Sequence, residues 1–258
     1  MNLYKLFDLS PFVLVMIIFL LICLVGVLGK YFRKKWREKH PEITLQGRIS
    51  AAAFGILSLL MAFTFSVAMS KFETQRRLIA QEAAYINTAL LRCDIYPDSL
   101  RNLLRADFRE YIEARIAYYN ELDNDKSRKE RKKGELIAKR IWDKTVLQMQ
   151  NSESAVRSGQ MIPAVNNMMD IAITRDGEKI SKVPMLVLWV LLIFMLIDGF
   201  VVGIEIFDKN KPLVTMFANA IVMALTLNLI IELHQPRTGL INLDAVEQKI
   251  VDLREFVK

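Results

Sequence analysis

Apolar residues in this chain gather in four long blocks, and most polar residues lie between or after them. The blocks hold about 19 to 25 residues each, which is the length that an α-helix needs to cross a hydrocarbon core of about 30 Å. They run over residues 9–29, 49–70, 183–207 and 213–231. Core helices can also be apolar, but a chain of 258 residues that is 53% hydrophobic has too little polar surface to cover four of them. The pattern therefore predicts an all-α membrane protein with four transmembrane helices.

The first block, residues 9–29, has the position of a secretory signal peptide. It is longer than the apolar core of such a peptide, and its positive charges follow the apolar run instead of preceding it. We therefore expect it to be retained as the first membrane span.

The second block is expected to continue beyond the bilayer as one long helix. No proline occurs between Arg48 and Tyr96, and Gly55 lies in the apolar part, where membrane helices tolerate glycine. Beyond that part, hydrophobic residues recur at helical spacing at Leu78, Ile79, Ile86 and Leu90. The helix is predicted to end near Pro97.

Residues 71–182, between the second and third spans, are predicted to form an extramembrane helical bundle. A helix that begins at Pro97 would carry an apolar stripe of Leu100, Leu104, Phe108, Tyr111, Ile112, Ile116 and Tyr119. Its other face would carry Arg101, Arg105, Arg109, Glu110, Glu113 and Arg115. Two more helices are expected over residues 135–149 and 163–175.

The basic stretch 122–135 lies between two of these helices. It contains no aromatic residue to stack on bases, and acidic residues are mixed with the basic ones. We interpret it as a solvated connection between helices, in preference to a nucleic-acid site. Residues 175–181 contain an Asp-Gly pair, which predicts a turn that leads the chain back to the membrane.

The chain therefore divides into four parts. Residues 1–70 hold the first two transmembrane helices and a basic connecting loop, residues 71–182 the extramembrane helical domain, and residues 183–234 a hairpin of the third and fourth transmembrane helices. In the carboxyl-terminal tail, residues 235–258, a turn is predicted at Pro236 and Gly239. A short amphipathic helix is predicted to follow, with apolar positions at Val246, Ile250, Leu253 and Val257.

Charge sets the expected orientation of the chain. Residues 30–48 hold seven Lys or Arg residues against two Glu residues, and short basic loops are retained in the cytoplasm. The amino terminus and the helical domain would then lie in the periplasm or outside the cell. Much of the formal net charge of +7 lies next to the predicted spans. We therefore expect it to attract anionic lipid head groups and not nucleic acid.

No catalytic or metal-binding pattern is found in the sequence. The two histidines, His40 and His234, have no nearby nucleophile and no metal-ligand spacing. Carboxylates such as Glu110 and Glu113 alternate with arginines at three- and four-residue spacing, as in surface ion pairs. We therefore expect neither an enzyme nor a bound cofactor or metal.

Polar residues inside the apolar blocks are candidate functional residues. An ionised Asp198 in the third block would cost on the order of 3 kcal/mol to insert, so this side chain must be protonated, paired or in contact with water. It could line a hydrated path or bind a partner helix, or it could form a hydrogen bond within the helix bundle. In the fourth block, Asn228 offers an amide contact between helices, and Glu232 lies near the membrane interface.

The second block carries Phe63, Thr64, Phe65 and Ser66 in succession. These residues could form a narrow apolar constriction flanked by hydroxyl groups. Alternatively, the two phenylalanines pack against neighbouring helices.

Five segments of the chain carry a resemblance to a known family: LLMAFTFSVAMSKFETQRRLIAQEA, TALLRCDIYP, REYIEARIAYY, MIPAVNNMMDIA and the tail HQPRTGLINL. Together they resemble the bacterial bestrophin-like integral membrane proteins, a family described as a domain of unknown function and distantly related to bestrophins. The resemblance covers residues 48–254. Its tail motif includes Pro236, Arg237, Gly239 and Leu240.

The resemblance implies a multi-pass protein of the bacterial inner membrane that forms a homo-oligomer, a pentamer if it follows the bestrophins. Bestrophins are calcium-regulated anion channels whose second membrane helix lines the pore, so chloride or another small anion is the implied permeant species. Phe63 and Phe65 would correspond to the hydrophobic neck, although a spacing of two places them on different sides of a helix. In bestrophins the large helical part and both termini are cytoplasmic, whereas the basic loop predicts that they lie outside here.

Two functional hypotheses follow. The leading one is an oligomeric, bestrophin-like membrane protein that conducts anions, with the second membrane helix lining the axis. The alternative is a non-conducting sensor or scaffold whose extramembrane helical domain binds a ligand or a protein partner.

Overall fold

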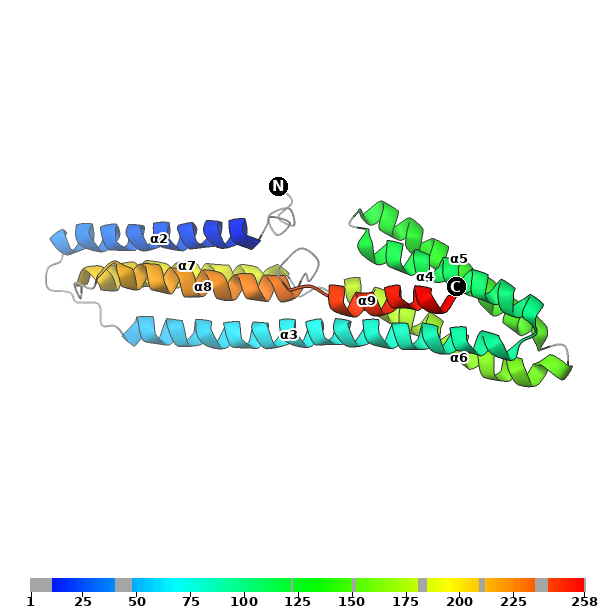
Figure 1. Cartoon of the computed structure of the whole chain (residues 1–258). Coiled ribbons are helices and arrows are strands. Elements are labelled where there is room, and N and C mark those ends of the chain that lie inside the picture. Colours follow the sequence, from blue (N-terminus) through cyan, green and yellow to red (C-terminus); the bar gives the residue numbers. More distant parts are fainter. Residues whose placement is uncertain are drawn as a thin grey trace. The chain divides into compact units, whose positions relative to one another are not determined.

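The computed structural model describes residues 11–39, 48–121, 123–149, 152–180, 185–208, 212–234 and 241–257. Every regular element within these ranges is a helix (Figure 1), which confirms the predicted all-α fold class. The chain forms two compact units. One comprises Met1–Glu73 with Lys182–Asn242, and the other comprises Thr74–Ser181 with Leu243–Lys258.

The first unit contains the four predicted membrane spans. They are α2 (Pro11–Lys39), the amino-terminal part of α3 (Arg48–Leu91), α7 (Met185–Asp208) and α8 (Val214–His234). Each of these helices has a segment that is long and apolar enough to cross a membrane. Many large apolar side chains of these four helices are exposed in the single chain, as expected for helices that lie in lipid.

Glycines bring α2 and α7 into backbone contact. A Cβ atom on Gly203 would lie 1.9 Å from the carbonyl oxygen of Gly26, and one on Gly29 would lie 2.2 Å from the carbonyl oxygen of Phe200. Gly199 and Gly203 form a G-x-x-x-G pair, the spacing that lets membrane helices approach closely. Gly26 and Gly29 of the first span therefore make their close contacts with the third span.

The two helices run in the same direction. Gly199 lies against Ile22, and further along both helices the guanidinium carbon of Arg37 lies 5.8 Å from the ring centre of Phe207. Two spans that cross the bilayer in the same direction require one further crossing between them. The apolar part of α3 is the described helix between them that has the composition for that crossing.

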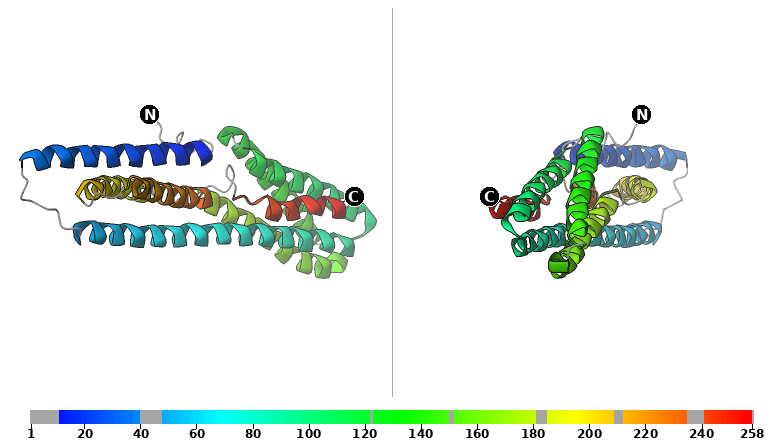
Figure 2. Two further views of the ribbon diagram at one scale, coloured as in Figure 1. Left: turned by 60° about the vertical axis from the view of Figure 1, so that its left-hand side comes forward. Right: turned by 90° about the vertical axis from the view of Figure 1, so that its right-hand side faces the viewer.

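The second unit is the helical bundle. It contains the rest of α3, a 3₁₀ turn η1 (Arg92–Ile95), α4 (Asp98–Asn120), α5 (Asn124–Gln148), α6 (Ser152–Ile180), α9 (Asp244–Asp252) and a 3₁₀ turn η2 (Leu253–Val257). The long helix is confirmed, because α3 is continuous over 44 residues and α4 begins directly after Pro97. Figure 2 shows α4 and α5 side by side. Fully buried side chains of the bundle core include Ile86, Leu90, Leu104, Phe108, Ile112, Ile141, Val165 and Met168.

The prediction of a solvated connection over residues 122–135 is wrong for most of that stretch. Helix α5 already begins at Asn124, because the carboxylate of Asp123 accepts hydrogen bonds from the backbone N–H groups of Asp125 and Lys126 and caps the helix. The basic residues that follow are good helix formers, and Ser127 is buried with its hydroxyl donating to the carbonyl oxygen of Tyr118. Tertiary contacts and a cap therefore turn a charged stretch into helix.

Helix α6 is also longer than predicted. It spans Ser152–Ile180 instead of 163–175, with Pro163 inside it and the predicted Asp-Gly turn in helical conformation. Gly177 in an exposed helical position costs only about 0.5–1 kcal/mol. The buried side chains of Arg175 and Asp176, immediately before it, hold this turn of the helix in place.

Replacing Gly203 by valine is expected to destabilise the membrane unit, because the added atoms would overlap the backbone of Gly26. Overpacking of this kind costs about 1–3 kcal/mol or more. Thermal unfolding of the purified protein in detergent checks this. Gly55→Ala is the matched control, since its Cβ would meet no atom within 4 Å and no destabilisation is expected. An unchanged melting temperature for Gly203→Val would contradict the close contact.

Candidate functional site

The four successive residues predicted as a constriction point to different sides of α3. In the single chain Phe63 is 63% exposed, Ser66 is exposed, Phe65 is half-buried and Thr64 is buried. The hydroxyl of Thr64 donates to the carbonyl oxygen of Leu60 at 2.8 Å, within the same helix. The four residues therefore do not form one cluster in a single chain.

The polar residues of the third and fourth spans form short hydrogen-bonded pairs. Asn219 donates its amide N–H to the carboxylate of buried Asp198 at 2.9 Å, which links α8 to α7. Asn228 donates to Glu232 at 2.7 Å, and this contact lies within α8. The second carboxylate oxygen of Glu232 accepts from the backbone N–H of Ile241 at 3.4 Å. Asp198 is thus hydrogen-bonded within the membrane unit, between the third and fourth spans.

The tail motif of Pro236, Arg237, Gly239 and Leu240 lies outside the described residues. Of the two histidines, His40 also lies outside them. Within the part of the chain that the structure describes, no group of His, Cys, Asp and Glu residues has the geometry to hold a metal ion.

A highly organised polar site lies in the helical bundle, where buried charged side chains from three helices meet. We name it the buried ionic cluster. Its members are Glu82 on α3, Arg115 and Tyr119 on α4, and Arg175 and Asp176 on α6, with Glu247 of α9 at its edge.

Glu82 is the centre of the cluster. Its side chain is completely buried, and its two carboxylate oxygens lie 2.6 Å from Nε of Arg115 and 2.6 Å from Nη1 of Arg175. One carboxylate on α3 thus holds guanidinium groups from α4 and α6. A buried charge is tolerated only with such complete pairing, because removal from water is costly.

Tyr119 connects the remaining charges. Its hydroxyl donates to Asp176 at 2.9 Å and accepts from Nη2 of Arg115 at 2.7 Å. The same Arg115 nitrogen lies 3.3 Å from Asp176. The guanidinium carbon of Arg175 lies 3.3 Å from the centre of the Tyr119 ring, a cation–π contact in a desolvated setting.

The protonation states follow from these neighbours. Burial alone would lower the pKa of Arg115, but Glu82 and other nearby groups raise it well above its ordinary value. Burial and then the charge of Glu82 raise the pKa of the Tyr119 hydroxyl far above its usual range, so it remains a donor at neutral pH. At neutral pH the cluster therefore holds a charged Arg115 guanidinium and a neutral Tyr119.

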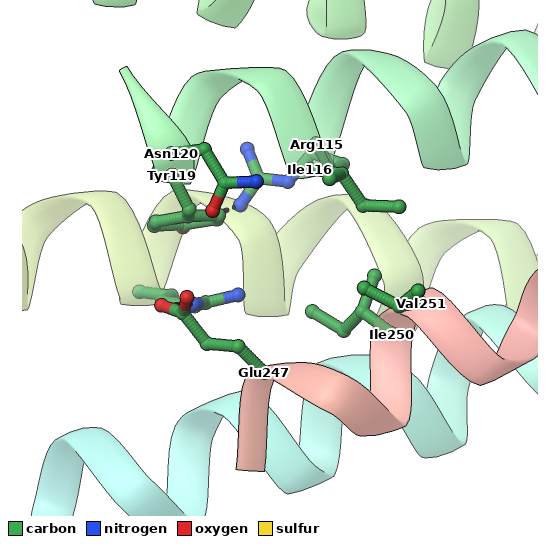
Figure 3. Close-up of a pocket in the computed structure, with 8 residues that line it drawn as sticks. Arg115, Ile116, Tyr119, Asn120, Glu247, Ile250 and Val251 are labelled. Carbon is green, nitrogen blue, oxygen red and sulfur yellow. Dashed lines mark hydrogen bonds and ion pairs between the residues drawn. The ribbon is translucent and has the colours of Figure 1, made fainter. Parts of the chain in front are cut away.

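A small pocket opens beside the cluster (Figure 3). Arg115, Tyr119 and Asn120 of α4 line one side of it, and Glu247, Ile250 and Val251 of α9 line the other. The carboxylate of Glu247 lies 3.2 Å from Nη2 of Arg175. The cluster has no nucleophile beside a base, and its chemistry is that of a structural joint between α3, α4, α6 and α9.

The sequence pattern predicted Arg115 on the polar face of its helix. This prediction is wrong, because Arg115 is only 2% exposed. A signal for the cluster was nevertheless present. Glu82 stands four residues after Leu78 and four before Ile86, and Arg115 stands midway between Tyr111 and Tyr119. A charged residue inside an apolar stripe at helical spacing indicates a buried ion pair with a partner elsewhere in the chain.

Glu82→Gln is expected to destabilise the bundle strongly, because it leaves two buried guanidinium groups without their shared counter-charge. Breaking a buried pair in this way costs about 3–5 kcal/mol. Unfolding of the purified protein, followed by circular dichroism, measures the loss. Glu110→Gln is the control, because Glu110 pairs with Arg140 on the exposed surface and little change is expected there. Equal effects of the two substitutions would contradict the central position of Glu82.

Comparison with solved structures supports the fold. A bacterial bestrophin homologue from Klebsiella pneumoniae is 14% identical, with a TM-score of 0.70 over 93% of this chain and 98% of that chain. A variant of that homologue is 13% identical, with a TM-score of 0.71 over 93% and 99% of the two chains. A structure described as a membrane protein, also 13% identical, has a TM-score of 0.73 over 93% and 98%. At these identities the likeness establishes the fold alone.

Sequence comparison establishes the family. A search of curated proteins gave no significant match. The model of the bestrophin-like domain matches residues 16–246, which include the four spans except the first residues of α2, and most of the helical bundle. The chain therefore belongs to the bestrophin-like family.

Proposed function

We propose that the protein is an oligomeric anion channel of the bacterial inner membrane, with the membrane part of α3 nearest the axis of the assembly. Family membership supports channel activity, since known bestrophins are anion channels. Chloride or another small anion is the proposed permeant species, and five is the proposed number of subunits, by analogy with bestrophins.

The observation that carries the proposal is an exposed apolar stripe on α3. Ile56, Leu59, Phe63 and Val67 are each at least half exposed in the single chain, and their spacing of three and four residues places them on one face of the helix. Helix α2 has a comparably exposed apolar stripe, which we assign to lipid because α2 already packs on α7 through its glycines. A face that is left open by its own subunit is available to other copies or to an axis between them.

The chemistry of this stripe suits a pore constriction. Ser66 is exposed and lies about one helical turn beyond Phe63, so an apolar ring would adjoin polar groups. Hydrophobic constrictions gate channels by excluding water, and adjoining hydroxyls can donate hydrogen bonds to a passing anion. Asp198, Asn228 and Glu232 are paired within the subunit and are proposed to stabilise the spans.

The helical bundle is proposed to lie in the periplasm. The carboxyl-terminal part of α2 carries exposed Lys34, Lys35 and Lys39, and such basic ends are retained in the cytoplasm. One crossing by α3 then places the bundle on the opposite side.

The alternative is a non-conducting sensor or scaffold. It is favoured by the continuity of α3, which carries the span and also Glu82 at the centre of the buried ionic cluster. A ligand that rearranged the cluster would act directly on the same helix that enters the membrane. Such a protein would respond to a ligand or a protein partner without passing ions.

Purified protein in planar bilayers is expected to pass an anion-selective current. Phe63→Cys, in a background in which Cys23 and Cys93 are alanine, should then be inhibited by a charged thiol reagent, because the modified side chain would obstruct the axis. Leu225→Cys is the control, since Leu225 is similarly exposed but lies on α8. Absence of current over a range of voltages and calcium concentrations would remove the channel proposal. Inhibition of both variants alike would instead contradict the position of α3.

A cysteine at Lys129, in the same cysteine-free background, is expected to react with a membrane-impermeant maleimide in intact cells. Lys129 is exposed on α5, so its accessibility depends on the side of the membrane. A cysteine at exposed Lys35 on α2 should react only after lysis, because it lies on the other side of the α3 crossing. The reverse pattern would show that the bundle is cytoplasmic.

A further inference from the structure

The last ten residues of α2 form a strongly basic extension of the first span. Helix α2 continues without a break to Lys39, although its apolar run ends at Gly29. The extension, residues 30–39, contains six Lys or Arg residues and a single carboxylate, that of Glu38. Its function is not explained by conduction through an axis lined by α3.

The depth of this extension is set by the packing of the span. Gly29 lies against the backbone of Phe200 on α7, and the ring of Phe32 lies 5.9 Å from that of Phe200. Tyr31, which is 65% exposed, follows directly after the apolar run. Because aromatic residues of this kind favour the boundary between hydrocarbon and water, we place residues 31–39 at the level of the head groups.

The extension has two different faces. On the inner face, Arg33 is buried with its guanidinium carbon 5.0 Å from the ring centre of Trp36, and Arg37 approaches Phe207 of α7. On the outer face, Lys34, Lys35 and Lys39 are exposed, and Tyr31 and Lys35 are one helical turn apart. We name these three lysines with Tyr31 the lysine face.

The charges of the lysine face are not neutralised by the protein. Among the residues that the structure describes, no carboxylate forms an ion pair with Lys34, Lys35 or Lys39. Glu38 is the one acidic side chain in the extension, so the face keeps a net positive charge. Clusters of four to eight basic residues next to a membrane helix attract anionic lipids.

We propose that the lysine face binds the phosphate groups of anionic phospholipids in the leaflet at which α2 ends. The ammonium groups of Lys34, Lys35 and Lys39 supply the charge, and Tyr31 supplies an aromatic contact at the glycerol level. A soluble phosphate offers similar anionic oxygens but no acyl chains. It is therefore not held at the membrane surface, where the lysine face lies. The proposal requires only that α2 spans the bilayer, and it holds whether or not the protein conducts ions.

Trp36 offers a fluorescent reporter within the extension. The chain has three tryptophans, so replacing Trp142 and Trp189 by phenylalanine leaves Trp36 as the sole emitter. The full-length protein is reconstituted with mixtures of unlabelled lipid and lipid brominated near the glycerol end of its acyl chains, which quenches nearby tryptophans. Quenching by brominated phosphatidylglycerol is compared with quenching by brominated phosphatidylcholine.

Phosphatidylglycerol is expected to quench Trp36 preferentially, and added salt should weaken that preference. The triple variant Lys34→Gln, Lys35→Gln, Lys39→Gln should lose it, with the relative binding constant falling up to about fivefold for each charge removed. A control variant, Lys126→Gln, Lys129→Gln, Lys132→Gln, removes the same charge from exposed positions on α5 and should keep the preference. Size-exclusion chromatography verifies that both variants retain the assembly of the parent.

Three outcomes would overturn the proposal. The first is equal quenching by the two lipids in the parent protein. The second is an undiminished preference in the variant of the lysine face. The third is loss of the preference when glycerol phosphate replaces chloride at constant ionic strength, which would identify a site for soluble phosphate. If the variant of the lysine face changed the size of the assembly but kept the lipid preference, the proposal would also fail. The three lysines would then be assigned to contacts between copies of the chain.

Discussion

The peptide group cannot find a hydrogen-bond partner in hydrocarbon, and this constraint organises the whole molecule. Each segment that enters the bilayer must satisfy its own N–H and C=O groups, which in this chain means four helices. It also explains why apolar side chains remain exposed on α2, α3, α7 and α8 in the single chain. Lipid covers such side chains as well as protein does, so their exposure carries no cost in the membrane.

Without a hydrophobic driving force between spans, close packing has to hold them together. The glycines of α2 and α7 allow contact between backbones, and contacts at that distance collect dispersion energy from many atoms. The pair formed by Asp198 and Asn219 adds a hydrogen bond between α7 and α8. The spans are thus joined by the close contacts of glycines and by the hydrogen bond of the Asn219 amide, and not by the hydrophobic effect.

The helical bundle follows a different physical rule. It has a core of its own, in which burial of Ile86, Phe108 and Ile141 is stabilising and the buried ionic cluster is costly. Glu82 would be unfavourable there without both Arg115 and Arg175. Because the carboxylate accepts guanidinium groups from two different helices, a mispaired arrangement of the bundle would leave buried charge uncompensated. We infer that the charges in this core favour one arrangement of the helices over mispaired ones.

The sequence by itself determined the four spans, the continuous α3 and the start of α4, because these depend on local quantities: run length, helical periodicity and the position of Pro97. It did not determine that residues 124–134 are helical, since that depends on the cap at Asp123 and on burial of Ser127 against α4. Nor did it place Arg115 in the core. Only the tertiary structure decided that, because a charge can be buried when its partners arrive from elsewhere in the chain, here 33 and 61 residues away in Glu82 and Asp176.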